Sequence, residues 1–171
     1  MEEPKLTPGI NNGLGNKSKS FKCKYFINEK ESSEIYIFGE YFVENNKNKC
    51  HLIINGNDCE LRPKYRFKTK GEQTVTLVID QETTINFQGM FCNKKDFLDN
   101  FDHYIMNDNL IDVSNFENLD TSRCEDLSRM FCGCRNLKNF DFLLNWQIAN
   151  ILEVCLHSAV SLMLIFCLNG I

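Results

Sequence analysis

Nine cysteine thiols are the groups in this sequence best able to ligate a metal, form disulfides or act as nucleophiles. No two of them have the C-x-x-C spacing of zinc knuckles and thioredoxin-like redox centres. The odd count leaves at least one thiol unpaired in a monomer. Cysteine is also often buried as a small apolar residue, and we interpret most of these thiols as reduced core residues. They are Cys23, Cys50, Cys59, Cys92, Cys124, Cys132, Cys134, Cys155 and Cys167.

The three histidines are far apart, and one of them has carboxylates close by in the sequence. Asp99, Asp102 and His103 could together bind a metal or supply a general base. We favour the alternative that they lie in an exposed loop. The sequence also contains none of the P-loop, G-x-G-x-x-G, H-E-x-x-H or G-x-S-x-G motifs. We therefore expect no enzymatic activity, cofactor or metal.

Residues 62–71, RPKYRFKTKG, hold five basic residues and two aromatic ones. Such a run could bind anions or nucleic acid. We favour a solvated strand and turn leading to Gly71, because the whole chain contains 23 acidic and only 19 basic residues. The net charge of -4 likewise gives no excess to neutralise phosphates, so nucleic acid is not an expected partner.

The N-terminal residues 1–20 begin with acidic residues and lack the apolar stretch of a secretory signal. Their glycine, proline, asparagine and lysine content predicts a disordered lead-in. The missing signal favours a cytoplasmic location.

Residues 21–79 predict a small, mostly antiparallel β unit. Strands are expected at 21–27 and, because of its β-branched residues, at 74–79. A hairpin is expected at 50–61, where Asn55-Gly56 suits a tight turn with positive φ angles. Residues 34–43 predict one or two short strands with a bend at Gly39, followed by a polar turn.

After Asp80 the sequence repeats itself. Residues 84–92 echo residues 124–132, and both segments end in Met-Phe-Cys. Residues 110–116 recur less closely as residues 140–146. Recurrence at this spacing is typical of stacked supersecondary units.

The segment 110–146 resembles the BspA-like leucine-rich repeats of bacterial and protist surface proteins, whose repeat is about 26 residues long. The resemblance rests on an I-D-V-S-N-F start, a D-T-S turn and an M-F-x-x-C ending. It implies structural roles for Asp112, Phe116, Asp120, Thr121, Ser122, Leu127, Met130, Phe131, Cys134, Leu137 and Trp146.

The resemblance implies a parallel ladder with one strand from each unit, and a turn at D-T-S. The apolar residues between Cys124 and Cys134 are spaced as on a short helix that faces the core. Cys134 is then expected inside the stack, rather than as a ligand or nucleophile.

The apolar residues 148–171 end the chain and depart from the repeat pattern. We favour a buried cap or a decayed repeat, since the run at 154–168 is shorter than the ~20 residues that span a bilayer.

The predicted fold class is α+β: a small antiparallel β unit followed by a short solenoid of leucine-rich-repeat type. The expected divisions are a lead-in at 1–20, the β-rich domain at 21–79, degenerate repeats at 80–147 and the apolar segment at 148–171. The expected function is non-enzymatic protein binding through the repeat surface. The alternatives are a membrane-attached protein held by 148–171, and a fragment of a longer repeat protein; self-association is a further option.

Overall fold

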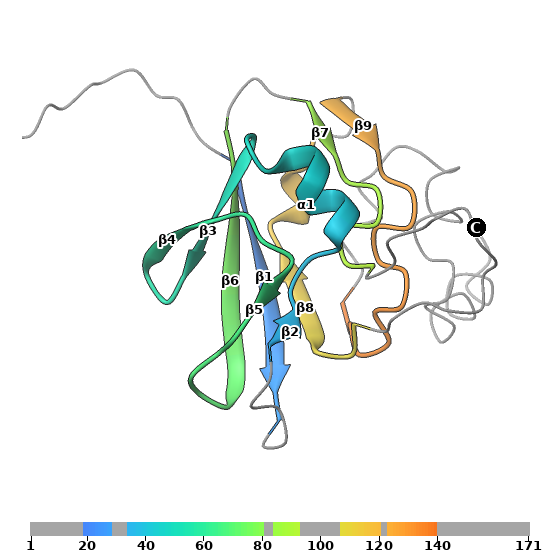
Figure 1. The fold of residues 1–171 in the computed structure, drawn as a ribbon. Helices are drawn as coiled ribbons and strands as arrows, with labels where there is room; N and C mark the ends of the chain where they lie inside the picture. Colours follow the sequence, from blue (N-terminus) through green and yellow to red (C-terminus); the bar gives the residue numbers. More distant parts are fainter. Residues whose placement is uncertain (1–18, 29–33, 81–83, 93–106, 121–122, 140–171) are drawn as a thin grey trace, which may run out of the picture.

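The computed structural model describes residues 19–28, 34–80, 84–92, 107–120 and 123–139 (Figure 1). Within them the chain forms nine strands, one α-helix and one short 3-10 helix. In order these are β1 (Lys19–Ile27), β2 (Ile35–Tyr36), α1 (Glu40–Asn46), β3 (Cys50–Ile54), β4 (Asn57–Glu60), β5 (Lys64–Tyr65), β6 (Gly71–Ile79), β7 (Ile85–Asn86), β8 (Leu110–Ser114), the 3-10 helix Phe116–Asn118 and β9 (Cys124–Asp126).

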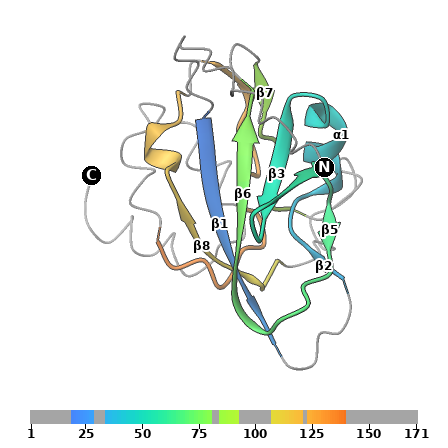
Figure 2. The same ribbon diagram turned by 90° about the vertical axis from the view of Figure 1, so that its left-hand side faces the viewer.

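A five-stranded antiparallel sheet forms one wall of the molecule, in the order β4-β3-β6-β1-β8 (Figure 2). The strands predicted at 21–27 and 74–79 become β1 and β6, which pair along their whole length. Buried and more exposed residues alternate along β1, as a half-buried strand requires. Phe21, Cys23, Tyr25 and Ile27 point into the core, and the residues between them point outward.

The predicted hairpin is confirmed as β3 and β4. Its turn consists of Asn55 and Gly56, whose φ angles are 53° and 77°. Both angles are positive, as a type I′ turn demands. The hairpin places β4 at one edge of the sheet, where the charged side chains of Asp58 and Glu60 discourage further strand pairing.

Helix α1 and the parallel β7–β9 pair lie on the same side of the large sheet (Figure 1). The prediction of strands over 34–43 is correct only for β2, because α1 begins directly after Gly39. The Gly39 amide donates to the Met90 carbonyl at 2.7 Å, and a Cβ on Gly39 would overlap the carbonyl oxygens of Gly89 and Cys92. Only glycine permits this close approach, which brings the helix against the next layer.

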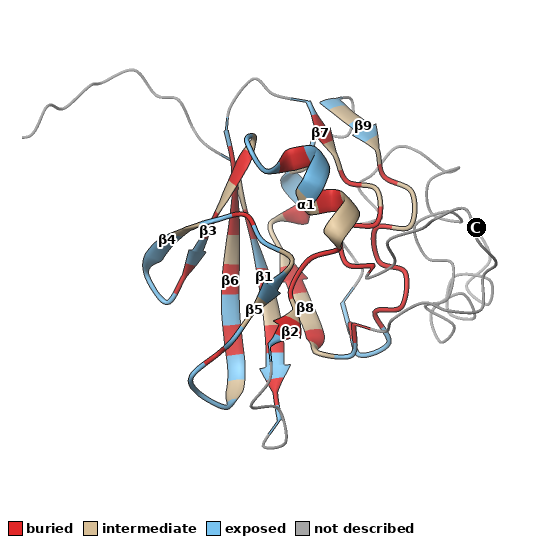
Figure 3. Cartoon of the chain, viewed as in Figure 1, coloured by how far each residue is buried: buried red, intermediate tan, exposed pale blue. Residues whose placement is uncertain are grey.

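Buried residues gather between the large sheet and the elements α1, β7 and β9 (Figure 3). Many of them are phenylalanines. Phe38, Phe91 and Phe131 form a series, with ring centroids 5.7 Å and 5.4 Å apart. Phe116 contacts both Phe91 and Phe131, and its ring lies 4.7 Å from that of Phe21 on β1. Aromatic pairs at such distances add to the stabilisation from apolar burial.

The predicted α+β class with a repeat solenoid is wrong. The described chain is predominantly β with a single α-helix, and its sheets do not form a solenoid. The residues 110–114, expected in a parallel ladder, form β8 and pair antiparallel with β1. The predicted helix at 124–134 is replaced by β9 and successive turns. Arg129 and Gly133 have φ angles of 56° and 80°, which a right-handed helix cannot contain.

Several predictions concern residues outside the described ranges. These are the disordered lead-in up to residue 18, the recurrence at 140–146 and the apolar segment 148–171. Within the part of the chain that is described, no helix is long and apolar enough to cross a bilayer.

Candidate interaction surfaces

The two Met-Phe-Cys segments, 84–92 and 124–132, lie side by side and run in the same direction. Their pairing begins at β7 and β9 and continues beyond both strands. Three amides of the first segment donate to three carbonyls of the second: Phe87 to Asp126 at 2.7 Å, Gly89 to Ser128 at 3.0 Å and Phe91 to Met130 at 3.0 Å. The sequence echo between the segments therefore corresponds to stacking in space.

Each segment also makes the same side-chain turn. The Asn86 carboxamide oxygen accepts a hydrogen bond from the Gln88 amide at 2.9 Å, and the Asp126 carboxylate accepts one from the Ser128 amide at 2.7 Å. Asparagine and aspartate commonly close turns in this way. Gln88 and Ser128 then join the two turns directly through a side-chain hydrogen bond of 3.2 Å.

The next residue of each segment has left-handed backbone geometry. Gly89 has a φ of 60° and Arg129 a φ of 56°. In both cases the following turn is closed by a cysteine amide: Cys92 donates to Gly89 at 2.9 Å, and Cys132 donates to Arg129 at 3.1 Å. The two segments are thus structural copies of one turn unit, and we call them the stacked turns.

The stacked turns bury most of the predicted motif residues. Six of these are at most 4% exposed: Phe116, Leu127, Met130, Phe131, Cys134 and Leu137. Asp112 is half-buried on β8, where its carboxylate lies 3.1 Å from the Lys24 ammonium, and Asp120 is exposed. Thr121, Ser122 and Trp146 lie outside the described residues.

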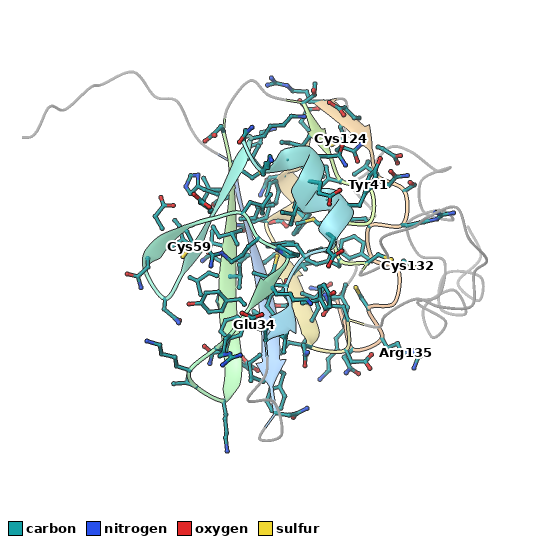
Figure 4. All side chains as sticks on the ribbon, viewed as in Figure 1. Glu34, Tyr41, Cys59, Cys124, Cys132 and Arg135 are labelled. Atoms are coloured by element: carbon teal, nitrogen blue, oxygen red, sulfur yellow. The ribbon has the colours of Figure 1, made fainter. Side chains whose placement is uncertain are left out.

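Five of the seven described thiols are buried, which suits packing rather than nucleophilic chemistry. Burial raises the pKa of the Cys134 thiol well above its usual value, and nearby Cys92 and Asp108 raise it further. Burial, with a smaller contribution from Asp112, also raises the pKa of Cys23. A raised pKa disfavours the thiolate, which is the reactive form. Cys59 on the β3–β4 hairpin and Cys132 on the stacked turns are at opposite sides of the molecule (Figure 4).

One histidine has two carboxylates nearby. The His51 ring nitrogens lie 3.7 Å from an Asp58 oxygen and 3.9 Å from an Asp80 oxygen. Among the described residues, no group of three or more His, Cys, Asp or Glu side chains is arranged to hold a metal ion. The Asp99, Asp102 and His103 cluster lies outside the described ranges.

The outer face of the large sheet is the first surface available to a partner. We define it by the outward side chains of β1, β6 and β3: Lys22, Lys24, Phe26, Glu72, Thr74, Thr76, His51 and Ile53. Phe26 is 44% exposed and Ile53 is 37% exposed, and these are the exposed large hydrophobic residues of the described chain. Both lie on this face, which Figure 2 shows from the front. Sequence reasoning missed both residues, although Phe26 alternates with the inward Tyr25 and Ile27.

The second surface is the basic segment, which we define as residues 62–70. Its five basic side chains are all exposed: Arg62, Lys64, Arg66, Lys68 and Lys70. The predicted strand and turn before Gly71 are present, since β5 occupies 64–65 and Gly71 begins β6 with a φ of 87°. The aromatic residues point the other way, and Tyr65 and Phe67 pack with ring centroids 4.8 Å apart.

Comparisons of the chain with protein-family models, with curated proteins and with solved structures give no match.

Proposed function

We propose that this chain is a non-enzymatic protein-interaction module that binds its partner through the outer face of the large sheet. The observation that carries the proposal is the placement of Phe26 and Ile53. An antiparallel sheet packed on one face normally presents polar residues on the other. Here two large apolar side chains stand among threonines and charged residues on the same outward face.

The strand register gives the separation of these two residues. Phe26 pairs with Glu72 of β6, and Ile53 pairs with Thr76 of the same strand. Four residues along a strand and two strand spacings place them about 17 Å apart. A standard interface buries about 800 Å² on each partner, which is a disc about 32 Å across. Both side chains therefore fit within one interface, where a few well-packed side chains contribute most of the binding energy.

The stacked turns support this proposal from the opposite side. They fill the inner face of the sheet with interlocked aromatic rings and hold β1 and β8 through Phe21 and Phe116. Because this packing already holds the sheet in place, the sheet loses little conformational entropy when a partner binds. The family resemblance also implies protein binding, although the solenoid fold that it implies is absent from the described residues.

Site-specific photo-crosslinking tests the proposal. The photoreactive amino acid benzoylphenylalanine would replace Phe26, and the full chain would be irradiated in extract of its native source. The matched control carries the same group at Tyr41 of α1, on the other side of the molecule (Figure 4). We expect a discrete protein conjugate at Phe26 only, and a lower yield when Ile53→Ser is added but not when Asn48→Ser is added.

The mass of the conjugate identifies the partner. Twice the mass of the chain indicates a second copy, and any other mass indicates a different protein. Either result supports the proposal. Equal yields from Phe26 and Tyr41, or no conjugate at Phe26, would contradict it.

A further inference from the structure

The basic segment is strongly positive, whereas the rest of the chain carries a net negative charge. Its nine residues contain five basic side chains and no acidic one. Because the whole chain has a net charge of -4 and the segment contributes +5, the remainder carries -9. An anionic partner is therefore attracted to this segment and repelled by the rest of the molecule.

Much of this charge is not neutralised within the described structure. The ion pairs within 4 Å involve Lys24, Lys49 and His51, and none of the described pairs involves Arg66 or Lys68. Lys64 is partly engaged, since its ammonium lies 4.4 Å from the centre of the Tyr36 ring and near Glu40 and Glu34. The cations that this leaves to a partner include Arg66 and Lys68, which are both exposed.

The segment is also held in place at both ends. The Pro63 carbonyl accepts hydrogen bonds from the Ile37 amide at 2.8 Å and the Phe38 amide at 3.2 Å. Phe67 is buried beside Tyr25, and the Gln73 side chain donates to the Lys70 carbonyl at 3.5 Å. A charged surface that is already ordered loses little conformational entropy when it binds.

The spacing of the charges indicates the shape of the partner. From Leu61 to Phe67 exposed basic residues alternate with less exposed ones, and where the chain is extended, at β5, every second residue corresponds to a step of about 6.7 Å. An extended peptide with an acidic residue at every second position has the same step. Its carboxylates can meet successive guanidinium and ammonium groups, and arginine can bind a carboxylate with two parallel hydrogen bonds.

We propose that the basic segment docks an extended acidic segment of a protein partner. Single-stranded nucleic acid is disfavoured, because Phe67 is buried and Tyr65 packs against it, so neither aromatic residue of the segment presents a fully exposed ring on which a base could stack. The basic segment ends two residues before Glu72 of the outer face, but the peptide test reports on Arg66 and Lys68 whereas the crosslinking test reports on Phe26, so the two proposals can fail independently.

The test measures binding of the full chain to a labelled peptide with glutamate at every second position. A peptide of the same composition with its glutamates contiguous tests the spacing. We expect the alternating peptide to bind more tightly, and its affinity to fall as salt is raised. The variant Arg66→Gln/Lys68→Gln should weaken binding by about threefold to tenfold, since each exposed ion pair contributes modestly.

The matched control is Arg135→Gln/Lys138→Gln, which removes the same charge from exposed positions on neither proposed surface. It should leave binding within about twofold of the parent, given the short range of screened charges. Equal weakening by both variants would show that only net charge matters and would overturn the proposal. So would no binding of the peptide, or tighter binding of a single-stranded oligonucleotide or of vesicles containing anionic lipid.

Discussion

The rings of Phe91 and Phe131 stack with their centroids 5.4 Å apart and their planes 23° from parallel. Each of these residues is the phenylalanine of one Met-Phe-Cys segment. Equivalent positions of the two segments therefore stack on each other and form a column of rings in the core. Phe38, two residues before α1, extends this column toward the helix. The column joins the helix, both stacked turns and, through Phe116, the large sheet.

Replacing Phe131 should therefore destabilise the whole described fold. The Phe131→Ala variant leaves a cavity beside Phe91 and Phe116, and we expect the free energy of unfolding to fall by about 3–5 kcal/mol. The matched control is Phe26→Ala, which removes a ring that is 44% exposed and should therefore cost clearly less than Phe131→Ala. Urea unfolding of both variants measures the difference. Equal losses would show that the Phe131 ring is not enclosed as described.

Asn46 allows a second test of the packing between α1 and β7. Its side-chain carboxamide bonds to both the carbonyl and the amide of Asn86, as the backbone of a neighbouring strand does. Its amide nitrogen donates to the Asn86 carbonyl at 2.6 Å, and its oxygen accepts from the Asn86 amide at 3.2 Å. Asn46→Ala leaves a partly buried peptide group without these partners, which we expect to cost about 1–3 kcal/mol. Asn45→Ala is the control, since that neighbouring side chain is exposed. A midpoint of thermal unfolding that falls equally in both variants would refute the role of Asn46.

The buried thiols predict a loss of stability at alkaline pH. Burial raises the pKa of Cys50 from 9.0 to about 12 and the pKa of Cys124 from 9.0 to about 11, and the carboxylates of Asp80 and Asp120 add to the respective shifts. Above pH 9.0 the thiols of the unfolded chain ionise while those of the folded chain stay protonated. The unfolded state then binds fewer protons, so stability is full below pH 9.0 and falls as the pH rises toward the folded values.

Urea midpoints measured under reducing conditions between about pH 8 and pH 11 check this prediction. The double variant Cys50→Ala/Cys124→Ala lacks two of the ionising groups, and its midpoint should decline less steeply with pH. A parent midpoint that stays constant over this range would contradict the described burial.

The sequence predicted those elements whose signal is local. The alternation in β1, the β-branched run in β6 and the Asn55-Gly56 turn each depend on a few adjacent residues, and all three are present. The Met-Phe-Cys echo likewise identified the two segments that stack. In each case the preference of the residues and the demands of the fold agree.

The errors arose where tertiary contacts decide the structure. The apolar spacing from Cys124 to Cys134 suits a helix, but it equally suits two turns whose left-handed residues are Arg129 and Gly133. Nothing in residues 110–114 shows that their partner is β1, far away in the sequence. Helix α1 was missed because tyrosine, phenylalanine and valine favour strands, whereas here Phe42 and Asn46 meet the core one helical turn apart.

The candidate surfaces were predictable to different degrees. The basic segment is visible in the sequence, and the structure adds that its basic side chains are all exposed while Phe67 is buried. Phe26 and Ile53 could not be chosen in advance, because an apolar residue in a strand is normally assigned to the core. Only the register of β1, β6 and β3 shows that both point outward on the same face.

Amide hydrogen exchange, resolved by residue, tests the parallel stack most directly, and the rigid backing of the sheet depends on that stack. We expect slow exchange for the amides of Phe87, Gly89 and Phe91, which donate across the stack, and fast exchange for the exposed Lys68 and Thr69. Phe131→Ala should speed exchange of the three donor amides under conditions in which the chain as a whole stays folded. Exchange of the three donors as fast as that of Lys68 would show that the two segments do not stack and that the sheet lacks the proposed rigid backing.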